Sequence, residues 1–181
     1  AGVIGAPEKQ RGGVYGTARQ MASCLKIRAI ERWVAPLGSN FSGDRRPQFD
    51  PDAFVRGTGT LYSLSKEGQG SAGALVTALT AAVVEAAEEY ATGQAGGRLA
   101  VPMLVVLDEA ANVCRWKNLP DLYSHYGSRG IPIMSLFQSW AQGQVVFGRE
   151  GMRKLWSASN VKLYLGAVAE ADLPPDLSAP V

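Results

Sequence analysis

Two apolar runs without polar alternation mark the second half of the chain. Residues 103–107 are Met-Leu-Val-Val-Leu, and residues 131–137 are Ile-Pro-Ile-Met-Ser-Leu-Phe. The first run is typical of a parallel strand that is buried on both faces, and the second predicts another strand. The segment that begins at Leu119 has a proline and an acid in its first turn, and it breaks at residues 127–130, which include two glycines. This is a helix pattern, so the order predicted is strand, helix, strand.

A longer periodic segment precedes the first strand. Apolar residues recur at helical spacing from about Ser71 to Ala91, with Ser71 as the cap. The side expected to be buried consists of Ala74, Leu75, Ala78, Leu79, Ala82 and Val83. A further strand is expected around Thr60–Leu64, which gives alternating strands and helices and therefore an α/β fold with a parallel sheet.

The first part of the chain has a different pattern. From Thr17 to Val34 the spacing predicts an amphipathic helix with Thr17 as its N-cap. Residues 1–16 are rich in glycine and are expected to be a lead-in, and residues 36–51 are polar and are expected to be a connector. The last residues, 173–181, contain three prolines and are expected to fray.

Composition narrows the class of protein. With 181 residues, 46% of them hydrophobic, the chain is long enough to form one core. It contains no run of about 18 apolar residues that would span a membrane, and no signal peptide is visible. Cys24 and Cys114 lack metal-binding spacing and are expected to be free thiols. The single histidine, His125, has no Cys or His neighbour, so we do not predict it as a ligand or base.

Polar side chains follow both predicted strands directly. Asp108 and Glu109 come after the first strand, and Gln138 comes after the second. The carboxyl ends of parallel strands meet at the edge where α/β folds bind ligands. An acid pair in this position is the pattern of a Walker B strand, whose Asp holds Mg²⁺ and whose Glu polarises the attacking water. The alternative interpretation of the acid pair alone is a strand that ends in two solvated acids.

Several segments in this region resemble one protein family. Residues 104–112, 119–122, 127–131 and 137–142 are similar to the TraG/TraD-type coupling proteins of type IV secretion, the ATPases of conjugative DNA transfer. The resemblance covers roughly residues 50–170 and is to actinobacterial members of this family. It implies an α/β, RecA-like parallel sheet over residues 37–181, the C-terminal part of a nucleotide-binding domain. Residues 1–36 would be the end of an inserted all-α domain.

The resemblance also implies a site and its ligands. ATP and Mg²⁺ would bind in the complete protein, with Asp108 holding the metal through water. Glu109 and Gln138 would contact the γ-phosphate or the attacking water. No Gly-x-x-x-x-Gly-Lys-Ser/Thr loop occurs in the chain, and residues 65–71 contain a lysine that precedes the glycines, the wrong order for a phosphate cradle. We therefore expect half of an ATP site, inactive on its own, from a chain that looks like a C-terminal piece of a longer protein.

By the same resemblance, the complete protein would be a homo-hexamer at the cytoplasmic face of the bacterial cell membrane, anchored by helices outside this chain. Its partners would be single- or double-stranded DNA, relaxosome proteins and the type IV secretion channel. The fragment itself is expected to be soluble and monomeric.

Charge bears on DNA binding only near the start of the chain. The net charge is +2, but the first 50 residues hold eight basic and four acidic side chains. Arg19, Lys26 and Arg28 are candidates to face phosphates, which attract Lys and Arg without sequence readout. The alternative is a solvated helix face.

Arg129 has two interpretations that the sequence leaves open. Ring ATPases often supply an arginine to the γ-phosphate of a neighbouring subunit, and the family often has an arginine in this turn. The alternative is a helix C-cap arginine that interacts with the helix dipole.

Three classes of function remain in view. The first is the Walker B half of a DNA-translocating ATPase, and the second is an ATP-independent docking module for relaxosome or secretion proteins. The third, a generic α/β enzyme in which Asp108 and Glu109 act alone, is disfavoured because no other Asp, Glu or His clusters with them in the sequence.

Overall fold

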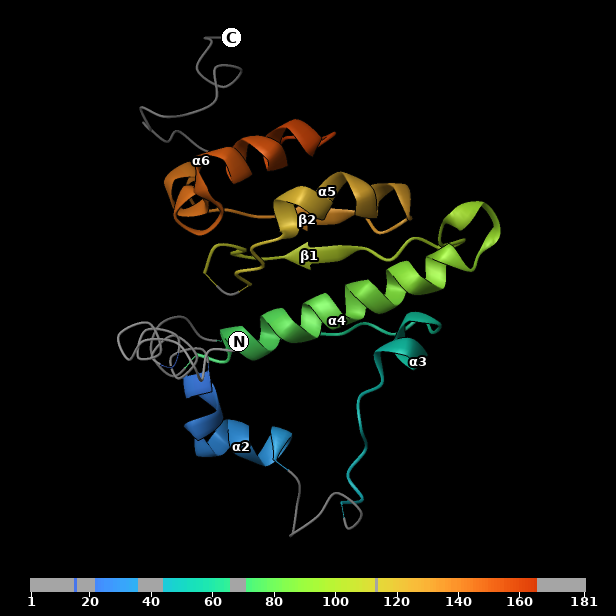
Figure 1. Cartoon of the computed structure of the whole chain (residues 1–181), viewed down its shortest axis with the longest axis vertical. Coiled ribbons are helices and arrows are strands. Elements are labelled where there is room, and N and C mark those ends of the chain that lie inside the picture. Colours follow the sequence, from blue (N-terminus) through green and yellow to red (C-terminus); the bar gives the residue numbers. More distant parts are fainter. Residues whose placement is uncertain (1–14, 16–21, 36–43, 66–70, 113, 166–181) are drawn as a thin grey trace, which may run out of the picture.

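The order of the helices and strands places one small parallel sheet among helices. The computed structural model describes residues 15, 22–35, 44–65, 71–112 and 114–165. The elements run along the chain as shown in Figure 1: η2 (Ala22–Lys26), α2 (Arg28–Val34), α3 (Pro51–Val55), α4 (Gly73–Thr92), η4 (Ala95–Gly97), β1 (Val105–Leu107), α5 (Leu119–Ser128), β2 (Ile133–Ser135) and α6 (Trp140–Ala158).

The predicted strand, helix and strand unit is confirmed. β1 and β2 pair in parallel, with Val105 opposite Ile133 and Leu107 opposite Ser135, and α5 connects them. Parallel strands need such a crossover because a tight turn reverses the chain. Within the described residues the sheet has two strands, and with its helices this is an α/β arrangement.

The prediction that the first strand is buried on both faces is wrong for the described chain. Leu107 is buried at the centre of the core, whereas Leu104 and Val106 of the same run are 63% and 54% exposed. On β2, Met134 lies opposite Val106 and is 45% exposed. Alternate side chains point to opposite faces, so one face of the sheet joins the helices in the core and the other face is uncovered.

α4 confirms the long predicted helix, but of the side expected to be buried only Val83 is fully buried. Residues of the second half are the ones in the core, namely Val83, Val84, Ala86, Ala87 and Ala91. Ala74 and Ala78 of the expected face are exposed. The difference arises because the core cluster gathers along the second half of α4 only, together with Leu119 and Tyr126 of α5. The N-cap is Ala72 and not Ser71 as predicted, although the Ser71 Oγ accepts the Gly73 N–H at 2.9 Å just before the helix.

Two further predictions fail in the first half of the chain. Residues 60–64 form no strand, and Tyr62 and Leu64 are 81% and 89% exposed. An extended segment becomes a strand only where a neighbouring strand completes its hydrogen bonds, and β1 pairs only with β2 in the described chain. The helix predicted from Thr17 is divided at Ile27 into η2 and α2, while residues 17–21 lie outside the described part. The lead-in and the tail 173–181 lie outside it as well, apart from Tyr15.

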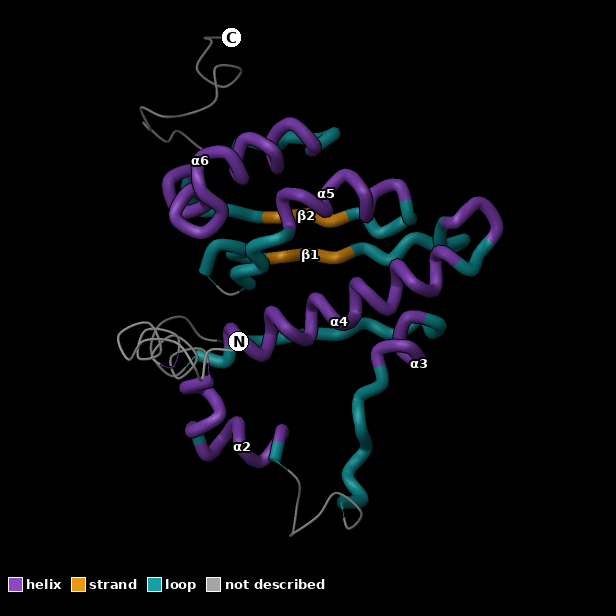
Figure 2. The backbone as a smooth tube through the Cα atoms, in the orientation of Figure 1, coloured by secondary structure: helices purple, strands orange, loops and turns teal. Residues whose placement is uncertain are grey.

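α6 turns back on itself, a feature that the sequence pattern did not predict. Gly148 interrupts the helix with φ 73° and ψ 169°, a backbone conformation that is almost confined to glycine. The two halves then pack together, because the rings of Trp140 and Trp156 meet edge to face with their centroids 5.8 Å apart. The change of direction is visible in Figure 2.

Candidate functional site

The ends of β1 and β2 are joined by two backbone hydrogen bonds beyond their last paired residues. The Leu136 N–H donates to the Leu107 carbonyl oxygen at 3.0 Å, and the Ala110 N–H donates to the Leu136 carbonyl oxygen at 3.1 Å. The second bond fixes the turn after β1 against the segment after β2. Residues 108–110 and 137–138 are therefore neighbours at the carboxyl edge of the sheet.

The Glu109 side chain lies at the centre of this edge. The Gln138 Nε2 donates to the Glu109 Oε1, and the Asn112 Nδ2 donates to the Glu109 Oε2 at 3.2 Å. The Glu109 backbone has φ 51°, a left-handed conformation that non-glycine residues rarely adopt and that clusters at functional sites. Both carboxylate oxygens thus accept a hydrogen bond from an amide. The two side chains that the sequence singled out, Glu109 and Gln138, are brought together by the fold.

Two further residues extend the contact. The Gln142 Nε2 donates to the Gln138 Oε1 at 3.5 Å, and Gln142 is held in the first turn of α6 by Ser139, whose Oγ accepts its backbone N–H at 3.1 Å. The sequence pattern alone gives no role to Asn112 or Gln142. Their spacing was the available signal, three residues after Glu109 and four residues after Gln138.

Asp108 immediately follows β1 and is exposed at the same edge. Mg²⁺ in nucleotide sites is commonly bound by one or two carboxylates together with phosphate oxygens and water. A single exposed carboxylate at the carboxyl edge fits this mode of binding. Among the described residues there is no group of three or more His, Cys, Asp or Glu side chains that would hold a metal ion by itself.

Arg129 lies at the other end of the sheet. It is the C-cap residue of α5, and its Nη1 donates to the Gly97 carbonyl oxygen at 3.0 Å. The Arg129 carbonyl oxygen accepts the Leu99 N–H, shortly before β1 begins. The structure therefore does not bring Arg129 together with Glu109 of the same chain. Its observed contacts anchor the connection between α4 and β1.

The contacts of His125 and the burial of the two cysteines indicate structural roles for these residues. The His125 Nε2 pairs with the Glu88 Oε1 at 2.6 Å and so links α5 to α4. Cys24 and Cys114 are buried free thiols, as the sequence predicted. Burial raises the pKa of the Cys114 thiol, although hydrogen bonds with Thr77 and Thr80 act in the opposite direction. A raised pKa leaves this thiol protonated and unreactive at neutral pH.

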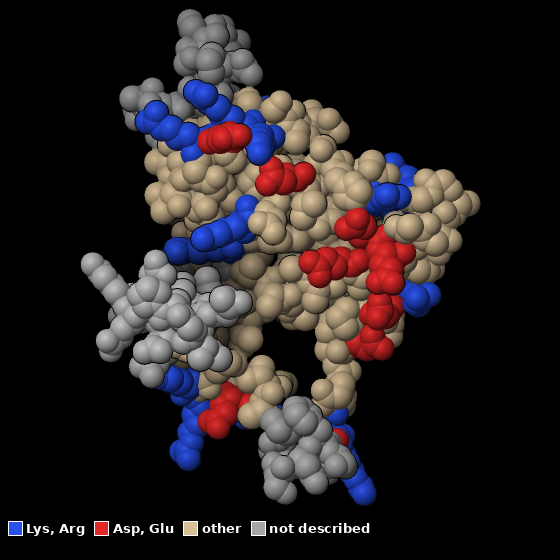
Figure 3. All heavy atoms as spheres, in the orientation of Figure 1, with Lys and Arg blue, Asp and Glu red and all other residues tan. Residues whose placement is uncertain are grey.

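The charged residues of the surface separate into regions. Figure 3 shows acidic side chains gathered where the second half of α4 lies and basic side chains over α6. Lys26 and Arg28 are exposed near η2 and α2, whereas Arg19 lies outside the described residues. No contact of these residues points to a nucleic acid, so DNA binding at Lys26 and Arg28 stays a prediction.

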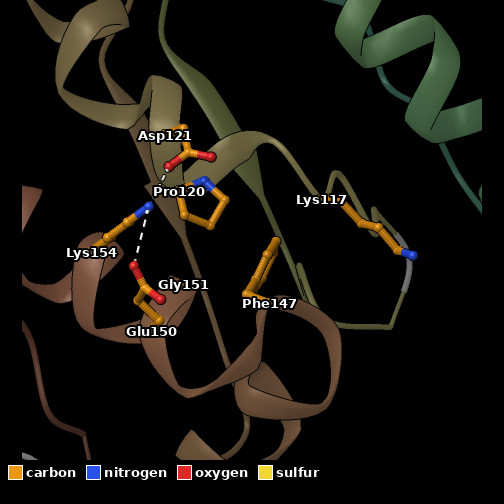
Figure 4. A pocket seen from close by; sticks show the side chains of 7 residues that line it. All are labelled: Lys117, Pro120, Asp121, Phe147, Glu150, Gly151 and Lys154. Atoms are coloured by element: carbon orange, nitrogen blue, oxygen red, sulfur yellow. Dashed lines mark hydrogen bonds and ion pairs between the residues drawn. The ribbon is translucent and has the colours of Figure 1, made fainter.

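A shallow pocket of about 200 Å³ lies where α5 meets α6 (Figure 4). The Lys154 Nζ bridges the carboxylates of Asp121, at 2.8 Å, and Glu150, at 3.6 Å. The hydrogen bond with Asp121 raises the pKa of Lys154. The pocket contains none of the side chains predicted for the nucleotide site, and its central ammonium is already paired with two carboxylates. We therefore assign it to the packing of α5 against α6.

Comparison with known proteins gives one relationship. Residues 102–181 match the family model described as "TraM recognition site of TraD and TraG". The match covers less than half of the chain and includes β1, α5, β2, α6 and the edge with Glu109 and Gln138. It supports a TraG/TraD-type coupling protein, C-terminal region, for this part of the chain. No curated protein and no solved structure matches the chain.

No helix in the part of the chain that the structure describes is long and apolar enough to cross a membrane.

Proposed function

We propose that this chain is part of the motor region of a conjugation coupling protein and carries the Walker B half of its ATP site. The observation that carries the proposal is the hydrogen bond from the Gln138 amide to the Glu109 carboxylate. It joins the ends of two adjacent parallel strands, the place where α/β folds bind nucleotides. The family match over residues 102–181 provides the biological setting.

Each side chain at the edge has a distinct role in this proposal. Asp108, exposed directly after β1, holds Mg²⁺ through water. Bound Mg²⁺ would neutralise charge on the phosphates. Glu109 polarises the attacking water, and Gln138 contacts the γ-phosphate or that water. Because both oxygens of Glu109 already accept amide hydrogen bonds, the carboxylate is held in one orientation before nucleotide arrives.

The remaining parts of the motor belong to the complete protein. A P-loop outside this chain would cradle the phosphates, and β1 and β2 would form two strands of a larger RecA-like sheet. The uncovered face with Leu104, Val106 and Met134 supports this view, since two strands with an exposed apolar face rarely suffice for a stable sheet. A hexameric ring that moves DNA into the secretion channel is the activity proposed for the whole assembly.

Two substitutions in the complete protein separate the proposed roles. Asp108→Asn should weaken Mg²⁺-dependent binding of ATP, because it removes the charge that holds the metal. Gln138→Ala should leave ATP binding near normal and slow hydrolysis, because it removes a contact to the γ-phosphate and not the metal ligand. Calorimetric titration of ATP and steady-state hydrolysis measure the two effects. Normal hydrolysis by the Gln138→Ala protein would contradict the assignment.

A second candidate function is docking of a relaxosome protein without ATP. The observation that favours it is the description of the matching family as a recognition site for TraM. The test is a titration of the chain with the TraM-type relaxosome protein of the same conjugative element, with and without ATP. Docking predicts the same affinity in both conditions and in the Glu109→Gln variant. Absence of binding would reject it.

A further inference from the structure

The orientation of the Gln138 amide is determined by what lies on either side of it. An ionised carboxylate only accepts hydrogen bonds, so the Gln138 amide must direct its NH₂ group toward Glu109. Its carbonyl oxygen then points away from Glu109 and needs a donor. The Gln142 Nε2, 3.5 Å from the Gln138 Oε1, is that donor.

Gln142 is itself held in place by the start of α6. Ser139 is the N-cap, with extended backbone angles, and its Oγ accepts the Gln142 backbone N–H at 3.1 Å. The adjacent residue Gly143 is buried against Met152 of the second half of α6. The first turn of α6 is therefore fixed both by its cap and by the core. It presents the Gln142 side chain to Gln138 from a rigid element.

We infer that Gln142 is a positioning residue for the proposed ATP site, because it holds the Gln138 amide, which Glu109 orients, in place at the edge of the sheet. The catalytic part of this inference rests on the proposed function. The contact between Gln142 and Gln138 is independent of it. Without a donor at position 142, the Gln138 side chain is held by Glu109 alone and its other end is loose. The looser side chain no longer keeps the amide where it would meet the γ-phosphate or the attacking water.

Three substitutions at Gln142 give different expectations from the same geometry. Gln142→Ala removes the donor and frees the Gln138 amide. Gln142→Glu keeps the shape but offers only acceptors, so it draws the Gln138 NH₂ group away from Glu109 and should have the largest effect. Gln142→Lys restores a donor and should stay close to wild type. Gln144→Glu is the matched control, since it adds the same charge two residues further along α6 on a different side of the helix.

The first measurement uses the 181-residue chain and needs no nucleotide. The side-chain NH₂ resonances of Gln138, assigned by their loss in Gln138→Leu, are recorded by NMR in each variant. We expect a shift and a loss of protection from solvent exchange in Gln142→Ala, a larger change in Gln142→Glu, and wild-type resonances in Gln142→Lys and Gln144→Glu. Unchanged Gln138 resonances in Gln142→Glu, or an equal shift in Gln144→Glu, would overturn the inference.

The second measurement uses the complete coupling protein. Gln142→Glu should lower kcat by roughly tenfold to a hundredfold, the range for a misplaced catalytic group, and leave the KM for ATP unchanged. A normal kcat in Gln142→Glu, where Glu109→Gln is inactive, would overturn the inference and leave the proposed function intact. If Glu109→Gln itself hydrolyses ATP normally, the proposed function fails, and the NMR result still decides whether Gln142 holds Gln138 in place.

Discussion

Gly143 lies directly against Met152, although both belong to the same helical element. A Cβ atom placed on Gly143 would lie 2.4 Å from the Met152 Sδ and 2.6 Å from its Cε. This contact is possible because Gly148 reverses the direction of α6 between them. The doubled helix places the first turn, with Ser139 and Gln142, in a fixed position beside the carboxyl edge of the sheet.

The first prediction is that Gly143→Ala lowers the free energy of unfolding by about 1–3 kcal/mol, the range for overpacking a core. The Met152 side chain is flexible but buried, so its displacement disturbs its neighbours. Denaturant unfolding measures the change. In a Met152→Ala background the clash is absent, and the same alanine should have little effect. The control is Gly127→Ala in α5, where a Cβ meets nothing within 4 Å. A cost at Gly143 that is equal in both backgrounds would contradict the contact.

The second prediction concerns Arg129. Its hydrogen bond to the Gly97 carbonyl oxygen should stabilise the connection between α4 and β1. Its Nε is buried without a hydrogen-bond partner among the described residues, which offsets part of the gain. Arg129→Ala should therefore lower the free energy of unfolding by about 1 kcal/mol, measured by denaturant unfolding.

The trans role, one of the two interpretations of Arg129 that the sequence leaves open, gives a different outcome for the same variant. If Arg129 reaches the site of a neighbouring subunit, Arg129→Ala slows ATP hydrolysis only in the assembled ring. Mixing it with the Glu109→Gln protein would then regenerate activity at interfaces that combine an intact Glu109 with an intact Arg129. Normal turnover in Arg129→Ala would remove the trans role.

The third prediction is a loss of stability at alkaline pH that depends on Tyr126. This side chain is 1% exposed, and burial, with the carboxylates of Glu88 and Glu85, raises its pKa from 10 to about 12. Folding therefore favours the protonated phenol, and this contribution is complete below pH 10 and is lost as the pH rises to about 12. Unfolding experiments across this pH range should show a steeper fall for the native chain than for Tyr126→Phe. Equal slopes would contradict the raised pKa.

The local pattern predicted the strand, helix and strand unit because its signals are contained within it. The proline and acid at the start of α5, the glycines at its end and the two apolar runs need no distant partner to act. The approach of Glu109 to Gln138 followed from the same unit, since parallel strands share their carboxyl edge.

The features of the fold that the sequence did not predict depend on contacts between distant residues. Residues 60–64 were expected to form a strand but find no strand neighbour in the described chain. The exposed Ala74 and Ala78 have helical spacing, but the core lies along the other half of α4. Neither α6 nor its reversal at Gly148 was predicted, because three glycines within residues 140–158 weaken the helical pattern and none of them by itself indicates a positive φ.

The fourth prediction is that the chain alone neither binds ATP tightly nor hydrolyses it. Affinity for a triphosphate comes chiefly from the P-loop backbone and its lysine, and the sequence contains no such loop. A calorimetric titration of the purified chain with ATP and Mg²⁺ measures this. Micromolar binding together with steady turnover would show that the chain holds a complete site.

The most direct test of the proposed site is ATP hydrolysis by the complete protein carrying Glu109→Gln. The substitution keeps the shape of the side chain and removes the negative charge that polarises the attacking water. It also retains an oxygen that accepts from the Gln138 amide, so the edge of the sheet should stay folded. The account predicts that hydrolysis is abolished while ATP still binds. Near-normal turnover by the Glu109→Gln protein would contradict it.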